Sequence, residues 1–433
     1  MEKKKVAFLT LGCKVNQYET NGMIQDFQEQ GYEIVDFESK ADIYIINTCT
    51  VTNMSDRKSR QFLRQAKKNN PDAVVVAVGC YVQVAKKELD EIPEIDLCLG
   101  TNEKTKIIEY VEKYLEDRKN DNILDEVLYD PNYEEFGSVT YTEKTRAVIK
   151  VQDGCDRFCS YCIIPYARGR VRSRDPKNVI EEVKKIAAEG LKEVVITGIH
   201  IASYGKDFKN GYELIDLLEE INEVDGIERI RLGSIEPLLI SQEFVDRLVK
   251  LEKICHHFHL SLQSGCTETL KRMNRRYTID QFKEIVDRLR KAYDDVILTT
   301  DIIVGFPDES DEEFETTYEF LKNIKFYKMH IFKYSQRKGT KAAVMKNQIP
   351  GDIKEIRSKR LLELSDINEK EYLNSYIGKE VEVLFEEKEK DEDFYKGHTA
   401  NYIMVKRKSE EDLSNKIVKV KVTGAEDLNL LSI

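Results

Sequence analysis

The stretch RAVIKVQDGCDRFCSYCIIPYARGR, residues 146–170, combines a strand, a group of cysteines and a group of arginines. Its first seven residues form a mainly apolar run that is typical of a buried strand. Cys155, Cys159 and Cys162 follow with the spacing C-x3-C-x2-C, and the arginines come directly after them. Because functional residues gather where parallel strands end, this order predicts a metal site at the carboxyl end of a strand.

The number of thiols in this loop indicates the kind of metal. A structural zinc site takes four ligands, and no fourth cysteine lies nearby in the sequence. A [4Fe–4S] cluster is held by cysteine thiolates, and a cluster held by only three of them leaves one iron free to bind a small molecule. The pattern therefore predicts an iron–sulfur cluster with one open iron.

The residues after this loop continue an alternation of strands and helices. Amphipathic helical patterns such as PKNVIEEVKKIAAEG (176–190) separate further strand-like runs. These runs are EVVITG (193–198), RIRLGS (229–234), FHLSLQ (258–263), VILTTDIIVGF (296–306) and MHIFKYS (329–335). Six such units predict an incomplete barrel of parallel strands over residues 144–375, with its site at the carboxyl ends of the strands.

Residues 1–118 show the same alternation and carry three more cysteines at matching places. The candidate strands KKVAFLTLGC (4–13), ADIYIINTC (41–49) and AVVVAVGC (73–80) end in Cys13, Cys49 and Cys80. Helical patterns between them predict a parallel sheet covered by helices. Ligands bind at the carboxyl edge of such sheets, so we expect the three thiols to converge there. The alternative is three unrelated core residues, since free cysteine is commonly buried.

The remaining residues suggest a linker and a third domain. Residues 119–143 are polar and acidic without clear periodicity, which predicts a linker. Residues 376–433 contain the short alternating runs KEVEVLFEE (379–387), HTANYIMVKRK (398–408) and IVKVKVTG (417–424). Such runs predict a small β-barrel. The fold class is therefore a multidomain α/β protein with a parallel sheet, a partial barrel and a small β-barrel in that order.

Composition limits the classes of protein that this chain can represent. The 433 residues carry a formal net charge of −11, which argues against a general nucleic-acid coat but leaves room for a local RNA contact. Nine cysteines, an odd number with tight local spacing, favour metal-bound thiols over a disulfide framework. No apolar run approaches the roughly 18 residues of a membrane span. We expect a cytoplasmic protein that does not associate with a membrane.

The cysteine loop, with the aromatic Tyr161 before its last cysteine, resembles the signature of radical S-adenosylmethionine (SAM) enzymes. The N-terminal segments TLGCKVNQYET, NTCTVTNMSDRKSRQ and AVGCYVQ resemble the first domain of methylthiotransferases. The segments DGCDRFCSYCIIPYARGRVRSR, TGIHIASYG, HLSLQSGCTETLKRMNRRYT and DIIVGFPDES resemble their radical SAM domain. The C-terminal strands resemble a TRAM domain, an RNA-binding β-barrel. The resemblance covers nearly the whole chain in the family's order.

The resemblance implies an enzyme with two [4Fe–4S] clusters. One cluster is expected on Cys155, Cys159 and Cys162, where SAM binds the open iron and yields a 5′-deoxyadenosyl radical. The auxiliary cluster, which carries the sulfur, is expected on Cys13, Cys49 and Cys80. We expect SAM contacts at Tyr161, Gly198, Ser234, Glu236, Gln263 and Asp301. The resemblance also implies a reductant such as flavodoxin or ferredoxin, and we expect a monomer.

Within the family, the first motif indicates a branch. LGCKVNQYET resembles the branch that acts on N6-threonylcarbamoyladenosine at position 37 of tRNA, next to the anticodon, and yields its 2-methylthio derivative. The branches that act on isopentenyladenosine and on a ribosomal protein show GCQMN-like and GCPKN-like motifs instead. One departure from the family is Asp308, at a place where glycine is common.

Two cationic segments are candidates for contact with the tRNA anticodon stem-loop. Arginine favours bidentate contact with phosphate, and a solvated loop paired with nearby acids is the alternative. The first segment follows the cysteine loop and the second lies in the third domain: Arg168, Arg170, Arg172 and Arg174, and Lys406, Arg407 and Lys408. Tyr402 near the second segment is either a base-stacking residue or part of the barrel core.

Two other functions compete with tRNA methylthiolation. A protein methylthiotransferase would modify a ribosomal protein and leave tRNA unchanged. A non-catalytic iron–sulfur protein that binds RNA or transfers electrons would show redox behaviour without forming 5′-deoxyadenosine from SAM. The predicted barrel and open iron argue against the non-catalytic protein, because an electron carrier needs neither.

Overall fold

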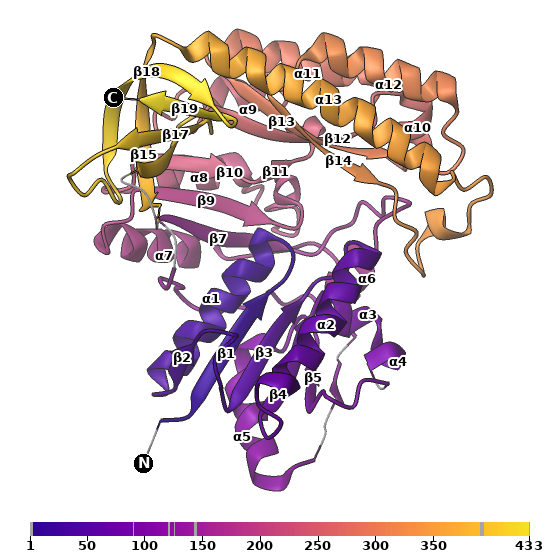
Figure 1. Cartoon of the computed structure of the whole chain (residues 1–433), viewed down its shortest axis with the longest axis vertical. Coiled ribbons are helices and arrows are strands. Elements are labelled where there is room, and N and C mark those ends of the chain that lie inside the picture. Colours follow the sequence, from indigo (N-terminus) through magenta and orange to yellow (C-terminus); the bar gives the residue numbers. More distant parts are fainter. Residues whose placement is uncertain are drawn as a thin grey trace.

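The computed structural model describes residues 3–89, 91–119, 122–124, 126–142, 145–389 and 394–432. Three parts follow one another along the chain, with the N-terminal sheet domain below the central strands in Figure 1 and the small C-terminal barrel at their upper left. The domain boundary expected between residues 143 and 144 lies outside the described residues. Within the described residues, no helix is both long and apolar enough to cross a lipid bilayer.

The N-terminal domain is a six-stranded parallel sheet of order β2-β1-β3-β4-β5-β6. Every residue of β3 and β4 is buried, because apolar cores cover both faces of the sheet. The strands are β1 (Lys5–Thr10), β2 (Glu33–Val35), β3 (Ile43–Thr48), β4 (Val74–Gly79), β5 (Leu97–Leu99) and β6 (Asn122–Ile123). The helices are α1 (Lys14–Glu29), α2 (Asn53–Asn69), α3 (Cys80–Val84), α4 (Lys86–Leu89) and α5 (Ile107–Asp117). The predicted parallel sheet is confirmed.

The central domain is an open barrel of parallel strands, as predicted. Neighbouring strands follow sequence order, and one strand is divided into β10 and β11 at Gly233. The strands are β7 (Arg146–Asp153), β9 (Glu193–Gly198), β10 (Arg229–Leu232), β11 (Ser234–Ile235), β12 (His257–Gln263), β13 (Ile297–Val304) and β14 (Lys328–Lys333), with the short antiparallel β8 (Arg172–Ser173) beside β7. The helices are α6 (Ile164–Arg168), α7 (Pro176–Ala188), α8 (Leu214–Asn222), α9 (Gln242–Leu248), α10 (Thr267–Arg272), α11 (Ile279–Ala292) and α12 (Asp311–Ile324).

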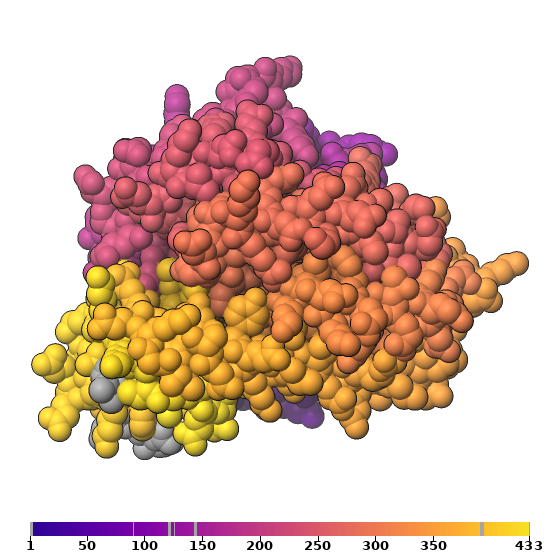
Figure 2. All heavy atoms as spheres, turned by 90° about the horizontal axis from the view of Figure 1, so that it is seen from above, coloured from indigo at the N-terminus to yellow at the C-terminus, as the bar shows by residue number. Residues whose placement is uncertain are grey.

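The C-terminal domain is a closed five-stranded barrel of order β15-β16-β17-β19-β18. The long helix α13 (Gly351–Tyr376) packs on β14 and leads into this barrel, and the two form one continuous surface in Figure 2. The strands are β15 (Glu380–Lys388), β16 (Phe394–Thr399), β17 (Met404–Lys408), β18 (Ile417–Glu426) and β19 (Asn429–Ser432). The single strand expected at 398–408 is wrong, because residues 400–403 form a turn in which Tyr402 is left-handed, with φ of 75°.

The segment expected to be a linker is packed against both neighbouring domains. Its described part adds β6 to the N-terminal sheet and then crosses to the central domain. Tyr133 donates a hydrogen bond to the Lys150 carbonyl at 2.7 Å, and Arg174 donates to the Gly137 carbonyl at 2.6 Å. Gln25 of α1 donates to the Ser138 carbonyl at 3.1 Å. These contacts fix the N-terminal sheet against β7.

Candidate functional site

The cysteines of the N-terminal domain meet at the carboxyl edge of its sheet. Cys13 follows β1, Cys49 follows β3 and Cys80 follows β4, and these three strands are adjacent. Gly12 has a φ of +102°, and a Cβ there would lie 2.8 Å from the Cys49 sulfur. Only glycine therefore allows the backbone before Cys13 to approach Cys49 this closely. Each of the nine cysteines, all within the described residues, is a free thiol.

The chemistry of this trio fits a metal cluster. Burial raises the pKa of Cys80 to about 11 and also raises the pKa of Cys49, and the neighbouring thiols add to both shifts. Cys49 and Cys80 are buried and Cys13 is exposed, and a nearby cation is needed to hold the two buried thiols as thiolates. Arg168, from the central domain, supplies positive charge because its Nε donates to the Cys80 sulfur at 3.1 Å.

The second cysteine trio lies in the loop after β7. Gly154 opens this loop with a φ of +69°, and a Cβ there would lie only 1.7 Å from the Arg170 carbonyl oxygen. The Cys155 amide donates to the Gly169 carbonyl at 3.0 Å, which closes the loop against α6. Burial raises the pKa of Cys155 to about 11 and that of Cys162 to about 12. This trio also fits a cluster that requires thiolate ligands.

Arg275 contacts the cysteine loop, although it was not among the expected SAM or RNA contacts. Its guanidinium lies 3.6 Å from the Cys159 sulfur and donates to the Ser261 carbonyl at 2.8 Å and to the Tyr277 hydroxyl at 3.0 Å. It therefore links the cysteine loop to the carboxyl end of β12. The cationic run KRMNRR was visible in the sequence, but nothing in that run distinguished this arginine from its neighbours.

The expected RNA contact of Arg168, Arg172 and Arg174 is wrong, because all three side chains are buried between domains. Arg172 donates to the Arg168 carbonyl at 2.7 Å, and Arg174 pairs with Glu182 at 2.6 Å. These partners leave no surface for a phosphate group. Of the four arginines in this segment only Arg170 is exposed, where it lies 5.0 Å from the centre of the Phe158 ring.

Arg168 belongs to a buried ion network that joins the two cysteine sites. Its guanidinium lies 2.8 Å from Glu19 of α1 and 3.1 Å from Asp153 at the end of β7. Lys150 and Lys104 also pair with Glu19, at 2.8 and 3.2 Å. Burial alone would raise the pKa of Glu19, but the surrounding cations of Arg168, Lys104 and Lys150 lower it far below its usual range. The network therefore holds the cysteine edge of the sheet against the carboxyl end of β7.

A cavity of about 680 Å³ occupies the lumen of the central barrel. Gly198, Ser234 and Asp301, three of the expected SAM-contact residues, line it together with Cys13 of the N-terminal domain. The lumen therefore opens directly onto one thiol of the first trio. Lys14 is exposed and also lines the cavity, and the atoms around it partly desolvate its ammonium and lower its pKa.

The other expected SAM-contact residues lie outside this cavity. Glu236 is buried and pairs at 3.2 Å with Arg157 of the cysteine loop. Gln263 is buried at the end of β12 with a φ of 74°. Tyr161 packs edge-on against Phe306 at 6.5 Å between ring centres. The structure thus brings Glu236 near the cysteine loop and places Tyr161 in an apolar cluster.

Polar groups inside the lumen form a connected row. The Thr299 hydroxyl contacts His257 Nε2 at 2.9 Å and His259 Nδ1 at 3.0 Å, and His259 Nε2 lies 3.2 Å from Asp301. Burial lowers the pKa of His257 well below its ordinary value, so its imidazole is neutral. The histidines and Thr299 were not predicted as site residues, because the sequence alone does not show which side chains of these strands face the lumen.

Tyr402 closes the amino end of the lumen, although it belongs to the C-terminal domain. Its ring stacks between His257 and His398, at 4.6 and 4.8 Å. Arg231 lies over the same ring at 4.9 Å and donates to the Ala400 carbonyl at 3.0 Å. Tyr402 therefore lies outside the apolar core of the C-terminal barrel, and the rings already stacked on it are histidines.

The cations expected on the C-terminal barrel do not form one face. Lys406 and Lys408 point to one side of β17 and Arg407 to the other, because side chains alternate along a strand. Lys408 is exposed, whereas Lys406 is half-buried and lies 3.3 Å from Glu389.

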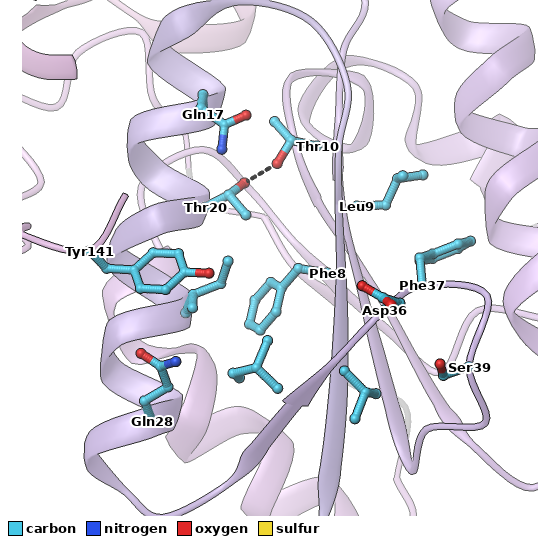
Figure 3. A pocket seen from close by; sticks show the side chains of 13 residues that line it. Phe8, Leu9, Thr10, Gln17, Thr20, Gln28, Asp36, Phe37, Ser39 and Tyr141 are labelled. Atoms are coloured by element: carbon cyan, nitrogen blue, oxygen red, sulfur yellow. Dashed lines mark hydrogen bonds between the residues drawn. The ribbon is translucent and has the colours of Figure 1, made fainter. Parts of the chain in front are cut away.

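A second hollow, of about 720 Å³, lies in the N-terminal domain (Figure 3). It exists because β2 pairs with β1 only as far as Ala7 and leaves the rest of that edge uncovered. The hydroxyls of Thr10 and Thr20 bond across it at 2.8 Å. Its described lining contains neither cysteine nor cation, so its chemistry does not point to a cofactor.

Comparison with known proteins agrees with this geometry. A family model described as Radical SAM superfamily matches residues 149–321, and one described as Uncharacterized protein family UPF0004 matches residues 5–100. The radical S-adenosylmethionine methyltransferase TsrM from Kitasatospora setae, solved with cobalamin and a [4Fe–4S] cluster, superposes with a TM-score of 0.57. The match covers 79% of this chain and 77% of that chain at 15% identity, which shows a shared fold alone.

Three curated relatives match over nearly their whole length. The threonylcarbamoyladenosine tRNA methylthiotransferase MtaB of Bacillus subtilis (strain 168) is 45% identical, over 97% of this chain and 94% of the relative. The protein of the same name from Aquifex aeolicus (strain VF5) is 44% identical, over 96% and 99%. The tRNA-2-methylthio-N(6)-dimethylallyladenosine synthase of Clostridium novyi (strain NT) is 34% identical, over 99% and 96%. This chain therefore belongs to the radical SAM methylthiotransferase family, in which two relatives named threonylcarbamoyladenosine tRNA methylthiotransferase are 44–45% identical to it.

Proposed function

We propose that this protein adds a methylthio group to C2 of N6-threonylcarbamoyladenosine at position 37 of tRNA. The observation that carries the proposal is the placement of two cysteine trios on two domains. One trio follows β7 at the mouth of the barrel, and the other presents Cys13 to the lumen of the same barrel. A reaction that needs two iron–sulfur centres and one target atom requires such an arrangement, because proximity and orientation lower the barrier.

Each trio has the donor set of a [4Fe–4S] cluster with an open iron. Cys155, Cys159 and Cys162 would hold the cluster that binds SAM, while Cys13, Cys49 and Cys80 would hold the auxiliary one. When bound, the two clusters and SAM would supply the radical, the sulfur and the methyl group. Protein side chains alone do not provide this chemistry. SAM would be contacted by residues at the carboxyl ends of the strands and in the cysteine loop: Tyr161, Gly198, Ser234, Glu236, Gln263 and Asp301.

The chain's own residues shape the space in which the target base reacts. Tyr402 and its flanking histidines lie across the amino end of the lumen. His259 and Asp301 offer a polar pair that can accept and donate hydrogen bonds to a purine edge. The network around Arg168 holds the N-terminal sheet in register with the barrel, so that Cys13 stays at the cavity wall.

RNA would be held by local cations, since the chain as a whole is acidic. Arg170 is exposed beside the cysteine loop and remains a candidate for phosphate contact there. Lys406, Arg407 and Lys408 are candidates on the C-terminal barrel. The substrate element would be the anticodon stem-loop, with SAM as cosubstrate. A flavodoxin or ferredoxin would supply electrons, and the protein would act as a monomer in the cytoplasm.

Mass spectrometry of tRNA nucleosides from cells that lack this gene tests the proposal. The expected result is loss of the 2-methylthio derivative with threonylcarbamoyladenosine retained. Purified enzyme with reconstituted clusters should restore the mark on tRNA from those cells when SAM and a reductant are present. An unchanged nucleoside profile, or methylthiolation of ribosomal protein alone, would overturn the proposal.

A further inference from the structure

Lys14 is the residue directly after Cys13, and both line the lumen of the central barrel. Within electrostatic range of its ammonium lie Tyr402, Arg146, Arg231 and Cys13. None of these groups is a carboxylate. In the part of the chain that the structure describes, no hydrogen bond or ion pair engages the Lys14 ammonium.

The other cations near this part of the lumen are already paired. Arg231 pairs with Glu193 at 2.7 Å, Arg146 with Glu386 at 3.2 Å and Lys328 with Glu369 at 3.1 Å. Among the described residues that line the cavity, Asp301 is the single carboxylate, and it is paired with His259. Lys14 therefore stands out as a cation in a lined cavity without an anion of its own.

We infer that Lys14 forms a carboxylate-binding subsite in the barrel lumen, and that this subsite selects adenosines whose N6 substituent carries a negative charge. The inference rests on the proposed function, since it assigns the group that reads the substrate of that reaction. A threonylcarbamoyl group ends in a carboxylate, whereas an isopentenyl or dimethylallyl group is apolar. An apolar substituent placed against Lys14 would desolvate its ammonium without pairing it, which is costly, so the same residue both attracts one substituent and rejects the other.

The position of Lys14 in the chain agrees with the chemistry of the base. In adenine, C2 and the carbon that bears N6 both adjoin N1, so they share one edge of the ring. A side chain that reads the N6 substituent must therefore lie close to the groups that act at C2. Cys13, at the cavity wall, and Lys14 are successive residues and meet this requirement.

A comparison of the affinities of two RNAs tests the subsite. Fluorescence anisotropy would measure binding of the reconstituted enzyme to an anticodon stem-loop that carries threonylcarbamoyladenosine, and to the same RNA with that carboxylate converted to its methyl ester. The wild-type protein should bind the free acid about 10- to 100-fold more tightly, as expected for one charge-assisted hydrogen bond. Lys14→Met should bind both RNAs alike, at the affinity of the ester, and Lys14→Arg should keep the preference.

Two controls separate this inference from other roles of Lys14. Lys283→Met removes an exposed lysine that pairs with Asp287 on the outer helix α11, and this variant should keep the full preference. The affinity for SAM and the iron content should be the same in Lys14→Met and in the wild-type protein.

Three results would overturn the subsite. The first is a wild-type enzyme that does not distinguish acid from ester. The second is a Lys14→Met variant whose affinity for both RNAs falls by the same factor, which would place Lys14 on an RNA phosphate. The third is a loss of SAM affinity, which would place it on the SAM carboxylate. Failure of the proposed function looks different: a wild-type enzyme with both clusters that methylthiolates neither RNA.

Discussion

The two cysteine trios differ in how the chain builds them. Cys155, Cys159 and Cys162 share one loop, in which the Cys162 amide donates to the Cys159 carbonyl at 2.9 Å. The other trio is assembled from the ends of three strands, and Cys80 receives a hydrogen bond from Arg168 of the central domain. A local loop keeps its geometry when the domain interface is disturbed, whereas a site shared between strands and domains does not. We therefore expect a disturbed interface to affect the auxiliary site more than the cysteine loop after β7.

The largest effect on activity is expected when one cysteine ligand is removed from either trio. Cys155→Ala and Cys80→Ala should both abolish the methylthio product, because each trio lacks a spare thiol. Only Cys155→Ala should also abolish formation of 5′-deoxyadenosine from SAM, since the Cys80 site lies on the other domain. Both products are measured by liquid chromatography and mass spectrometry. Cys266→Ala, a buried cysteine at neither site, is the control, and normal product from Cys80→Ala would contradict the assignment.

The next largest effect is expected at the interface. Arg168→Gln leaves the carboxylates of Glu19 and Asp153 buried with one cation fewer, which costs about 3–5 kcal/mol when a buried pair is broken. We expect earlier unfolding in urea and loss of iron from the auxiliary site, with the radical SAM site retained. Arg168→Lys keeps the positive charge and should lose less stability and less iron than Arg168→Gln. Normal stability and iron content in Arg168→Gln would show that the interface does not control the auxiliary site.

Arg275 is the counterpart of Arg168 at the other trio and sharpens the comparison. Arg275→Met removes the guanidinium near the Cys159 sulfur and its bond to the Ser261 carbonyl. A hydrogen bond to a charged group contributes about 1.5–3 kcal/mol, so SAM cleavage should fall about 10-fold or more. The auxiliary site should keep its iron, measured by Mössbauer spectroscopy. Iron loss confined to the auxiliary site would reverse the expected pattern.

A smaller effect is expected at the exposed arginine of the same segment. Arg170→Ala should weaken binding of the anticodon stem-loop a few-fold and reduce the salt dependence of binding by about one counterion. The folded structure should be unaffected, because the side chain is exposed and its partners among the described residues are Asp156 and Phe158. Anisotropy titrations at several salt concentrations measure both quantities. An unchanged salt slope would remove Arg170 from the RNA contact.

The smallest effect is expected away from both trios. Asp308 is left-handed, with φ of 65°, a conformation that glycine adopts more readily than aspartate. Asp308→Gly relieves the backbone strain at this position but loses a hydrogen bond from Asn347. The free energy of unfolding should therefore change by less than about 1 kcal/mol. Iron content should stay the same. A large loss of stability would show that the Asn347 contact matters more than the backbone conformation.

Much of the fold could be predicted because its signals are long or repeated. The buried runs ending in Cys13, Cys49 and Cys80 gave the parallel sheet, and six strand–helix units gave the partial barrel. The edge strands β2 and β6, of three and two residues, are too short to show a period. The turn at 400–403 was missed because apolar residues on both sides of it read as one strand.

The candidate site was less predictable, because burial depends on distant partners. Arg168 and Arg170 look alike in the sequence, yet Glu19 lies 149 positions from the first of them and makes it an interior residue. In the sequence, Lys14 is an ordinary charged residue after a cysteine. Its place in the lumen depends on the central domain and is visible only in the structure. Tyr402 enters the lumen of another domain, and no local pattern records that contact.

Iron and sulfide analysis of anaerobically purified protein tests the central claim most directly. Two [4Fe–4S] clusters give about eight irons and about eight sulfides per chain, with zinc absent. A variant with Cys155, Cys159 and Cys162 all changed to alanine should hold about four irons, and so should one with Cys13, Cys49 and Cys80 changed. About four irons in the wild-type protein, or zinc in place of iron, would contradict the account.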